Sequence, residues 1–218
     1  YRYIVIGSSP CPNDTSFLTI TLVQAPSAGT SGSFSVCSTA GVQDLFTQLG
    51  GTPGQGGTWT KPGSLPHSGQ FIPGTDIGGI YTYTVAGQSP CVNATATVTV
   101  TVQAAADPGT SGDTTVCSNG ISINLKNVLG TTATGTWSGP GTVTSNLYNP
   151  VTMNPGTYTF SIAATGVCPI ASATVDVAEV LAPDAGGNGT LSVCSSGASV
   201  DLFSRLSGTP AVGGSWTA

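Results

Sequence analysis

One set of short motifs occurs three times along this chain of 218 residues. Val-Cys-Ser stands at 36–38, 116–118 and 193–195, and a glycine-rich segment that ends in Trp59, Trp137 or Trp216 follows each copy. Two aromatic residues separated by one position stand at Tyr1/Tyr3, Tyr81/Tyr83 and Tyr158/Phe160. Cys37 and Cys117 are 80 positions apart, and Cys117 and Cys194 are 77 apart. This period predicts a tandem array of small domains, which more often serves as a spacer or contact surface than as a catalyst.

Alternating residues predict that each repeat is built from strands. Residues 79–85 place Tyr81 and Tyr83 on one face, and residues 97–102 alternate Thr with Val throughout. Turn-forming Gly and Pro separate these runs every 8 to 12 residues or so. Five to seven short strands per repeat predict an all-β chain of tandem immunoglobulin-like β-sandwiches. The Gly-x-x-Tyr pattern before the penultimate strand is typical of a tyrosine that anchors a sandwich corner.

One short stretch of each repeat has helical spacing instead. Val42, Leu45, Phe46 and Leu49 are spaced i, i+3, i+4, i+7, and glycines follow them. An acidic or amide residue precedes the apolar pair in each copy, at Asp44, Asn124 and Asp201. Because such side chains accept hydrogen bonds from the first free backbone N–H groups, we predict that they cap one or two helical turns.

The repeat frame divides the chain into two complete and two partial copies. Residues 1–23 are expected to be the C-terminal half of a preceding repeat, 24–102 and 103–180 two complete repeats, and 181–218 the N-terminal half of a following repeat. We expect the halves to belong to something that continues in both directions, either along the polypeptide or through neighbouring identical chains.

The recurring aromatic residues are predicted core anchors. Trp59, Trp137 and Trp216 stand on glycine-flanked strands, where a large side chain normally fills the sandwich core. Tyr81, Tyr83 and Tyr158 are assigned the same role on the penultimate strand. The alternative is that the three tryptophans are exposed platforms on which sugars stack.

The six cysteines are expected to form disulfides in an oxidising compartment, because they recur with the repeat and no Cys-x-x-Cys pair suggests zinc. Two pairing schemes fit the spacing. Cys37–Cys91 and Cys117–Cys168 would staple each repeat internally and leave Cys11 and Cys194 to partners outside the chain. Cys11–Cys37, Cys91–Cys117 and Cys168–Cys194 would instead bridge the linkers. The first scheme is favoured, since a domain of this size gains most from an internal staple.

Composition argues against several partners. Only 4 Lys+Arg and 9 Asp+Glu occur, and the net charge is −5. Scattered basic residues cannot neutralise a run of phosphates, so no nucleic acid partner is expected. No apolar run reaches the roughly 18 residues of a membrane span. With neither a signal peptide nor an initiating Met, the chain is expected to be a segment of a longer, processed extracellular protein.

No motif predicts catalysis, a metal or a cofactor. The sole histidine, His67, occurs in one repeat only and is expected on an exposed loop beside Pro66. The repeated Asp44 position is Asn at 124, which suits a cap better than a calcium site. Sequons for N-glycosylation occur at Asn13, Asn93 and Asn188, and Thr114 stands in a possible O-glycosylation motif.

Six motifs follow one another in the first complete copy: Val-Cys-Ser, Asp-Leu-Phe-x-x-Leu-x-Gly-Thr-Pro, Gly-Gly-x-Trp-Thr, Gly-x-Tyr-x-Tyr-x-Val, Pro-Cys and Ala-Thr-Val-Thr-Val. This series of motifs resembles the PKD-like and immunoglobulin-like repeats of giant Bacteroidota surface proteins. These include SprB-type gliding adhesins exported by type IX secretion. The second copy departs from the pattern at Lys126 and lacks Gly-Thr-Pro. The resemblance implies an extracellular, cell-surface, disulfide-stapled filament or stalk without an active site.

Three functions are therefore considered. The chain is expected to be a structural tandem-repeat segment of a long adhesin or filament, whose reach and repeated weak contacts sum by multivalency. Its partners would be further repeats of the same protein, neighbouring identical chains and environmental or cell-surface polysaccharide. The alternatives are a polysaccharide-binding module and accessory repeats of a secreted hydrolase.

Overall fold

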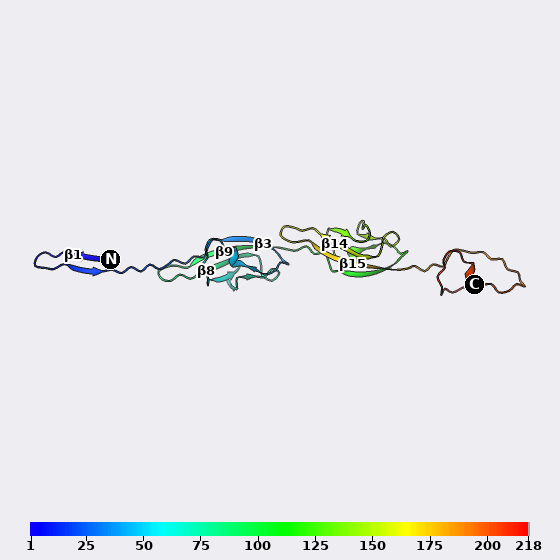
Figure 1. Ribbon diagram of the computed structural model, residues 1–218, viewed down its shortest axis with the longest axis horizontal. Helices are drawn as coiled ribbons and strands as arrows, with labels where there is room; N and C mark the ends of the chain where they lie inside the picture. Colours follow the sequence, from blue (N-terminus) through cyan, green and yellow to red (C-terminus); the bar gives the residue numbers. More distant parts are fainter. Residues whose placement is uncertain (218) are drawn as a thin grey trace. The chain divides into compact units, whose positions relative to one another are not determined.

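The computed structural model describes residues 1–217, which fall into two compact units, each with its own hydrophobic core (Figure 1). Unit 1 comprises Tyr1–Ala105 and Ala164–Pro169, and unit 2 comprises Ala106–Ala163 and the residues from Ile170 onwards. Ala218, the last residue of the predicted partial copy 181–218, lies outside the described residues. Strands dominate both units and helical segments are very short, so the all-β prediction is confirmed.

Besides the hairpin of β1 (Arg2–Val5) and β2 (Asp14–Phe17), unit 1 contains a sandwich of one five-stranded and one two-stranded sheet. The larger sheet has the order β3 (Gly32–Cys37), β9 (Ala94–Gln103), β8 (Gly79–Val85), β5 (Thr58–Lys61), β6 (Leu65–His67). The smaller sheet pairs β4 (Gln43–Asp44) with β7 (Gln70–Phe71). β3 runs parallel to β9, and every other pair is antiparallel.

Unit 2 repeats this arrangement with one strand fewer in the larger sheet. Its order is β10 (Gly112–Cys117), β15 (Ala171–Val180), β14 (Gly156–Ile162), β12 (Thr136–Ser138), and β11 (Ile123–Asn124) pairs with β13 (Leu147–Tyr148). β10 is again parallel to β15. Because no strand equivalent to β6 occurs in the described part of unit 2, β12 is an edge strand.

The core of unit 1 lies between its two sheets. Val98 and Val100 of β9 point inward, with 0% and 2% of their surfaces exposed, as the Thr-Val alternation predicted. The Phe71 ring of β7 meets the Tyr81 ring of β8 edge-on, with centroids 5.6 Å apart. Contacts of this kind close the two layers into an immunoglobulin-like β-sandwich.

The corner tyrosine is present in both units. The Tyr81 hydroxyl donates to the carbonyl oxygen of Ile77 at 2.8 Å, and the Tyr158 hydroxyl donates to that of Asn154 at 2.7 Å. Each bond joins the start of the penultimate strand to the backbone four residues earlier, which is the geometry of a sandwich tyrosine corner.

Each copy with a Val-Cys-Ser motif contains one short helical turn, as predicted. The turns are the 3₁₀ turn η1 (Leu45–Gln48), the helix α1 (Leu125–Leu129) and the 3₁₀ turn η2 (Phe203–Arg205). Leu45 and Leu49 are buried, whereas 56% of Val42 is exposed. The turn therefore begins only at Leu45, after β4, and Val42 takes no part in it.

The two partial copies are small. Residues 1–23 form an isolated hairpin of β1 (Arg2–Val5) and β2 (Asp14–Phe17), and η2 is the only helix or strand described after Val180. Both segments leave large apolar side chains exposed. Among the described residues, no helix has the length and apolarity needed to cross a membrane.

Candidate functional site

The most distinctive chemical feature is a disulfide between Cys37 and Cys168, with Cα atoms 4.9 Å apart. Cys37 ends β3, and Cys168 lies in the turn between β14 and β15. Both residues are 3% exposed. The bond joins the first complete predicted repeat to the second, so it belongs to neither predicted scheme.

The predictions for these two cysteines are therefore wrong. Cys37 is bonded neither to Cys91 nor to Cys11, and Cys168 neither to Cys117 nor to Cys194. Cys11, Cys91, Cys117 and Cys194 are free thiols here. The physical reason is the position of the turn that carries Cys168: its residues Ala164–Pro169 pack as part of unit 1, beside the end of β3.

Gln103, the last residue of β9, holds that turn in place. Its side-chain Nε2 donates to the carbonyl oxygen of Thr165 at 2.6 Å, and its Oε1 accepts from the backbone N–H of Val167 at 3.2 Å. Its own carbonyl oxygen accepts from the N–H of Ser38 at 2.8 Å, directly after Cys37. One residue, through its side chain and its backbone carbonyl, therefore positions both halves of the disulfide, although nothing in the sequence pattern singled it out.

The three tryptophans differ in burial. Trp59 is 7% exposed and packs 5.0 Å from the Tyr83 ring, as a core anchor should. Trp137 is half-buried, because β12 lacks an outer neighbour, and its Nε1 donates to Asn146 Oδ1 at 3.1 Å. Trp216 is 57% exposed, so its prediction as a core anchor is wrong in this structure. No strands equivalent to β8 and β9 cover it in the described residues.

The predicted tyrosine anchors and cap residues lie where each role requires. Tyr81, Tyr83 and Tyr158 are 0–2% exposed. Asp44 Oδ1 accepts from the N–H of Phe46, Asn124 Oδ1 from that of Lys126, and Asp201 Oδ1 from that of Phe203, at 2.9–3.0 Å. A carboxylate or amide engaged in this way serves the backbone and is not arranged to hold a metal.

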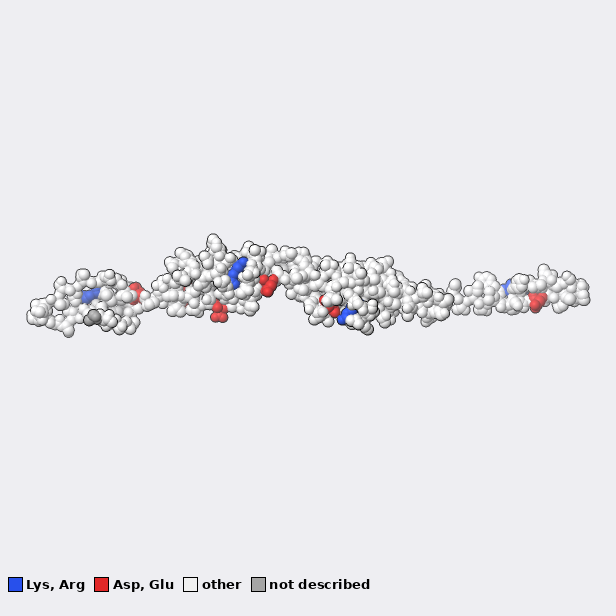
Figure 2. Space-filling view, turned by 180° about the vertical axis from the view of Figure 1, so that it is seen from behind, with Lys and Arg blue, Asp and Glu red and all other residues white. Residues whose placement is uncertain are grey.

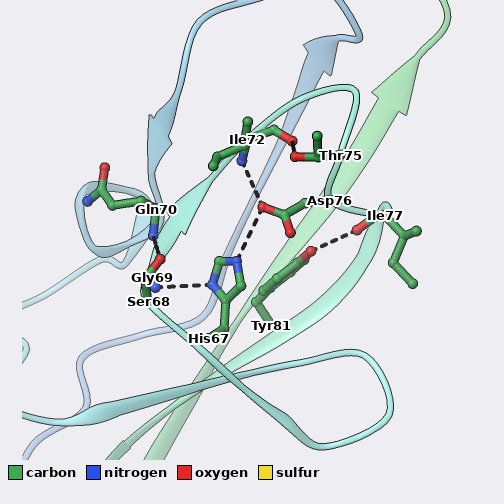
Figure 3. Close-up of polar contacts among 9 residues, drawn as sticks. All are labelled: His67, Ser68, Gly69, Gln70, Ile72, Thr75, Asp76, Ile77 and Tyr81. Carbon is green, nitrogen blue, oxygen red and sulfur yellow. Dashed lines mark hydrogen bonds and ion pairs between the residues drawn. The ribbon is translucent and has the colours of Figure 1, made fainter.

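His67 lies in a small polar cluster rather than on an exposed loop (Figure 3). It ends β6, its side chain is 7% exposed, and its ring packs against Tyr81. Its Nδ1 accepts from the N–H of Gly69 at 3.0 Å, and its Nε2 lies 3.3 Å from Asp76 Oδ2. The same carboxylate oxygen accepts from the N–H of Ile72 at 2.8 Å. The cluster therefore ties β6 to the loop between β7 and β8.

The protonation of this cluster favours a structural role. Burial raises the pKa of Asp76, but the Ile72 N–H, the His67 side chain and the charge of Lys61 outweigh burial and hold the pKa below 3.8. Asp76 is thus ionised at neutral pH and fully engaged in holding the loop. The described residues hold no group of three or more His, Cys, Asp and Glu that could hold a metal ion.

The rest of the surface offers few charges. Figure 2 shows isolated Lys, Arg, Asp and Glu side chains on a largely uncharged face. The sequon residues Asn13, Asn93 and Asn188 are exposed. Asn13 Oδ1 accepts from the N–H of Gly7 and Asn93 Oδ1 from that of Gly87, both at 3.0 Å, so these two amides stabilise equivalent hairpin turns. Thr114 lies on β10, and glycosylation of all four residues stays a prediction.

Comparison with known proteins leaves the family open. No protein-family profile and no curated protein matches the chain. Among solved structures, the chain is similar to Sidekick-1 immunoglobulin domains 1–5, with a TM-score of 0.27 and 14% identity over 73% of this chain and 42% of that one. It is also similar to Sidekick-1 immunoglobulin domains 1–4, with a TM-score of 0.26 and 16% identity over 71% and 52%. The chain thus spans about half or less of the length of these structures.

Proposed function

We propose that the chain is a non-catalytic, structural tandem-repeat segment of a long extracellular surface adhesin or filament. The disulfide between Cys37 and Cys168 is the observation that carries the proposal. A bond that joins consecutive repeats restricts how far the chain can be drawn out, which is useful to a stalk. Stable disulfides also favour an oxidising compartment outside the cell.

The repeats explain how the proposed adhesin would reach and attach to its partners. Sandwiches with the same strand order add reach one after another, and each has exposed residues on the outer face of its last strand, such as Thr99 and Thr101 on β9 and Asp176 and Ala178 on β15. Each contact made by such a surface is weak, but many linked contacts sum to firm attachment because later ones form at high effective concentration. The adhesive partners would be environmental or cell-surface polysaccharide and neighbouring chains.

The cellular setting is the finer part of the proposal. The motif resemblance suggests a Bacteroidota surface filament of the gliding-adhesin type, exported by type IX secretion. Antibodies raised against residues 24–180 should label the outside of intact cells that produce the protein. Labelling only after the cells are broken would contradict the surface location.

The extended form is tested by small-angle X-ray scattering on chains with two, four and eight joined copies of residues 24–180. If the chain forms a stalk, the maximum dimension of the joined copies should grow in proportion to copy number. Growth with roughly the cube root of copy number would mean that the copies collapse into a globule, and would overturn the proposal.

A polysaccharide-binding module is the alternative, and it needs aromatic rings open to solvent. Trp59 is buried and Trp137 is half-buried with its indole N–H engaged. Titration of the 218-residue chain with plant and bacterial polysaccharides, followed by tryptophan fluorescence, tests this alternative. Saturable binding that is lost in Trp137→Ala but kept in Trp59→Phe would favour it over the stalk.

A further inference from the structure

Two equivalent hairpin turns dock in equivalent ways within unit 1. Cys168 Sγ lies 3.5 Å from the carbonyl oxygen of Gln103, and Cys91 Sγ lies 3.5 Å from that of Val23. Val23 stands 80 positions before Gln103, and Cys91 stands 77 positions before Cys168. The chain therefore contains two examples of one junction, in which a hairpin cysteine lies beside the backbone at the boundary with the preceding copy.

The side chains at the two junctions differ. At the later junction, Gln103 Nε2 donates to Thr165 O at 2.6 Å, and Gln103 Oε1 accepts from the N–H of Val167 at 3.2 Å. In the earlier hairpin, Pro90 stands at the position of Val167 and has no N–H to donate. Val23, at the position of Gln103, can form neither side-chain bond. Each junction thus has matched residues: a glutamine meets a hairpin that offers an N–H, and a valine meets one that does not.

A glycine completes the match at the later junction. Gly166 has a φ of 55°, and a Cβ atom on it would stand 2.3 Å from Gln103 Oε1. Ser89 is the equivalent residue of the earlier hairpin. A hairpin with Ser-Pro in place of Gly-Val would therefore push the Gln103 side chain aside and would also offer it one donor fewer.

Both matched features are exceptions among their counterparts. Gln103 is the exception at its position, because Val23 and Val180 are valines. The hairpin of Gly166 is the exception among the three hairpins, because the other two read Ser-Pro-Cys, at 9–11 and 89–91. The two exceptions meet at one junction, and that junction is the one closed by a disulfide. A matched pair predicts this coincidence.

We propose that Gln103 and Gly166-Val167 form a matched pair that directs Cys37 to Cys168, and that valine with Ser-Pro is the other form of the same match. Gln103 is a positioning residue: its side chain holds the hairpin, while its carbonyl oxygen accepts from the N–H of Ser38, beside Cys37, at 2.8 Å. The match raises the effective concentration of the two thiols toward each other. It goes beyond the proposed function and does not depend on it, because it concerns how the junction closes and not what the array binds.

The bond closes by thiol–disulfide exchange, with glutathione disulfide as the oxidant. One protein thiolate attacks a glutathione sulfur, forms a mixed disulfide and releases one glutathione thiolate. The second protein thiolate attacks the protein sulfur of the mixed disulfide, forms the Cys37–Cys168 bond and releases the second glutathione thiolate. Two protein thiols are oxidised, one glutathione disulfide is reduced, and the two thiol protons end on glutathione. The equilibrium constant of this reaction therefore measures the effective concentration of the two protein thiols.

The first measurement uses the whole chain with its four free cysteines replaced, so that only one pair reacts. The background substitutions are Cys11→Ser, Cys91→Ser, Cys117→Ser and Cys194→Ser. The chain is equilibrated with reduced and oxidised glutathione in known ratios, and the fraction of disulfide is determined by peptide mapping after acid quenching. Gln103→Val should lower the effective concentration roughly tenfold, because it removes two hydrogen bonds that contribute about threefold or more each.

An exchange of the hairpin residues provides the matched counterpart. Gly166→Ser/Val167→Pro, with Gln103 kept, should lower the effective concentration roughly tenfold or more, because it removes the N–H donor and displaces the glutamine side chain. Adding Gln103→Val to these two substitutions recreates the residues of the earlier junction. This triple variant should return to within about threefold of the unaltered chain, as expected for strongly coupled positions. Gln24→Val, at an exposed position, is the control and should change nothing.

The choice of partner is measured with all six cysteines present. After refolding in a glutathione buffer, peptide mapping of the unaltered chain should find Cys37 bonded to Cys168. In Gln103→Val, Cys37 should be found bonded to Cys11 and Cys91 as well. In the triple variant, Cys168 should again be its main partner.

Two results would overturn the proposal. The first is a triple variant in which the two losses add, because a loss that came only from damaged folding would persist there, whereas a matched pair requires recovery. The second is a Gln103→Val chain that behaves like the Gln24→Val control. Neither result affects the scattering test, so failure of the match and failure of the stalk are distinguishable.

Discussion

At the scale of residues, the two sandwiches fill equivalent core positions with different side chains. In unit 1 the Phe46 ring meets the Tyr83 ring edge-on, and the Tyr83 hydroxyl bonds the adjoining loop. In unit 2 Lys126 replaces Phe46 and Phe160 replaces Tyr83. The Lys126 ammonium lies 5.3 Å from the Phe160 ring centre and donates to the carbonyl oxygen of Ala133. The substituted lysine thus supplies the hydrogen bond that the missing hydroxyl cannot make.

Glycine makes these contacts possible. A Cβ atom on Gly57 would come within 2.5 Å of the Tyr83 ring, and one on Gly135 within 2.7 Å of the Phe160 ring. The glycines two positions before Trp59 and Trp137 are therefore fixed by close approach of the aromatic ring.

Replacing Lys126 by Met should destabilise unit 2. The change keeps the aliphatic stem but removes the ammonium, so Ala133 O loses its donor and Phe160 its cation, at a cost of about 1–2 kcal/mol. Urea unfolding of the chain measures the loss. Arg2→Met, at an exposed position, is the control and should change stability little. Equal effects of the two variants would contradict this role for Lys126.

Asp76 makes the stability of unit 1 depend on pH. Its pKa is depressed in the folded state, so its ionised form contributes stability above the ordinary value of 3.8, and that stability is lost as pH falls through the lower, folded pKa. Asp76→Asn should cost about 1–2 kcal/mol at pH 7. The difference from the unaltered chain should shrink below about pH 4.

Thermal unfolding from pH 3 to pH 7 tests this expectation, with Asp113→Asn on the exposed face of β10 as the control. A difference that stays constant over this pH range would show that the Asp76 charge is not responsible.

At the scale of elements, period and length decided what could be predicted. β8 and β9 alternate over 7 and 10 residues, and their inward faces follow from the sequence. β6 spans only 3 residues and contains Pro66. The absence of its counterpart from the described part of unit 2 leaves no recognisable pattern in the sequence. Trp137, predicted as a core anchor, is only half-buried for this reason, because the absence of a neighbouring strand cannot be inferred from the tryptophan itself.

The caps show an element that sequence predicts well. The Asn124 side chain accepts from Lys126 N at 3.0 Å, and Gly130 ends α1 with a φ of 68°. Asn124→Ala should therefore cost about 1 kcal/mol, whereas Asn124→Asp should stay within a few tenths of the unaltered chain. Denaturant unfolding separates these outcomes. An aspartate variant as unstable as the alanine variant would show that capping is not what Asn124 supplies.

At the scale of the whole molecule, the disulfide pattern was the part that sequence could not give. One kind of cysteine stands in Val-Cys-Ser (Cys37, Cys117 and Cys194), and the other stands in the hairpin before the last strand (Cys11, Cys91 and Cys168). The spacing therefore predicts that a cysteine of the first kind pairs with one of the second kind. It leaves open which hairpin Cys37 joins: both predicted schemes took the hairpin of its own or of the preceding repeat, and the structure has that of the next. Gln103 settles this by holding the second hairpin beside β3, and one glutamine among polar linker residues gives no signal in advance.

The disulfide predicts how the chain responds to force. Tension applied at the two ends passes from Cys37 directly to Cys168, so the 131 positions between them are protected from stretching. Single-molecule pulling on Cys37→Ser/Cys168→Ser should give a fully extended chain roughly 450 Å longer than the unaltered one, at about 3.5 Å per residue. Cys11→Ser/Cys91→Ser is the matched control, because it removes two thiols that are free in the single chain, and it should leave the extended length unchanged. If the Cys37→Ser/Cys168→Ser variant and the unaltered chain extend equally, the bond carries no load, and the mechanical basis of the proposed stalk is lost.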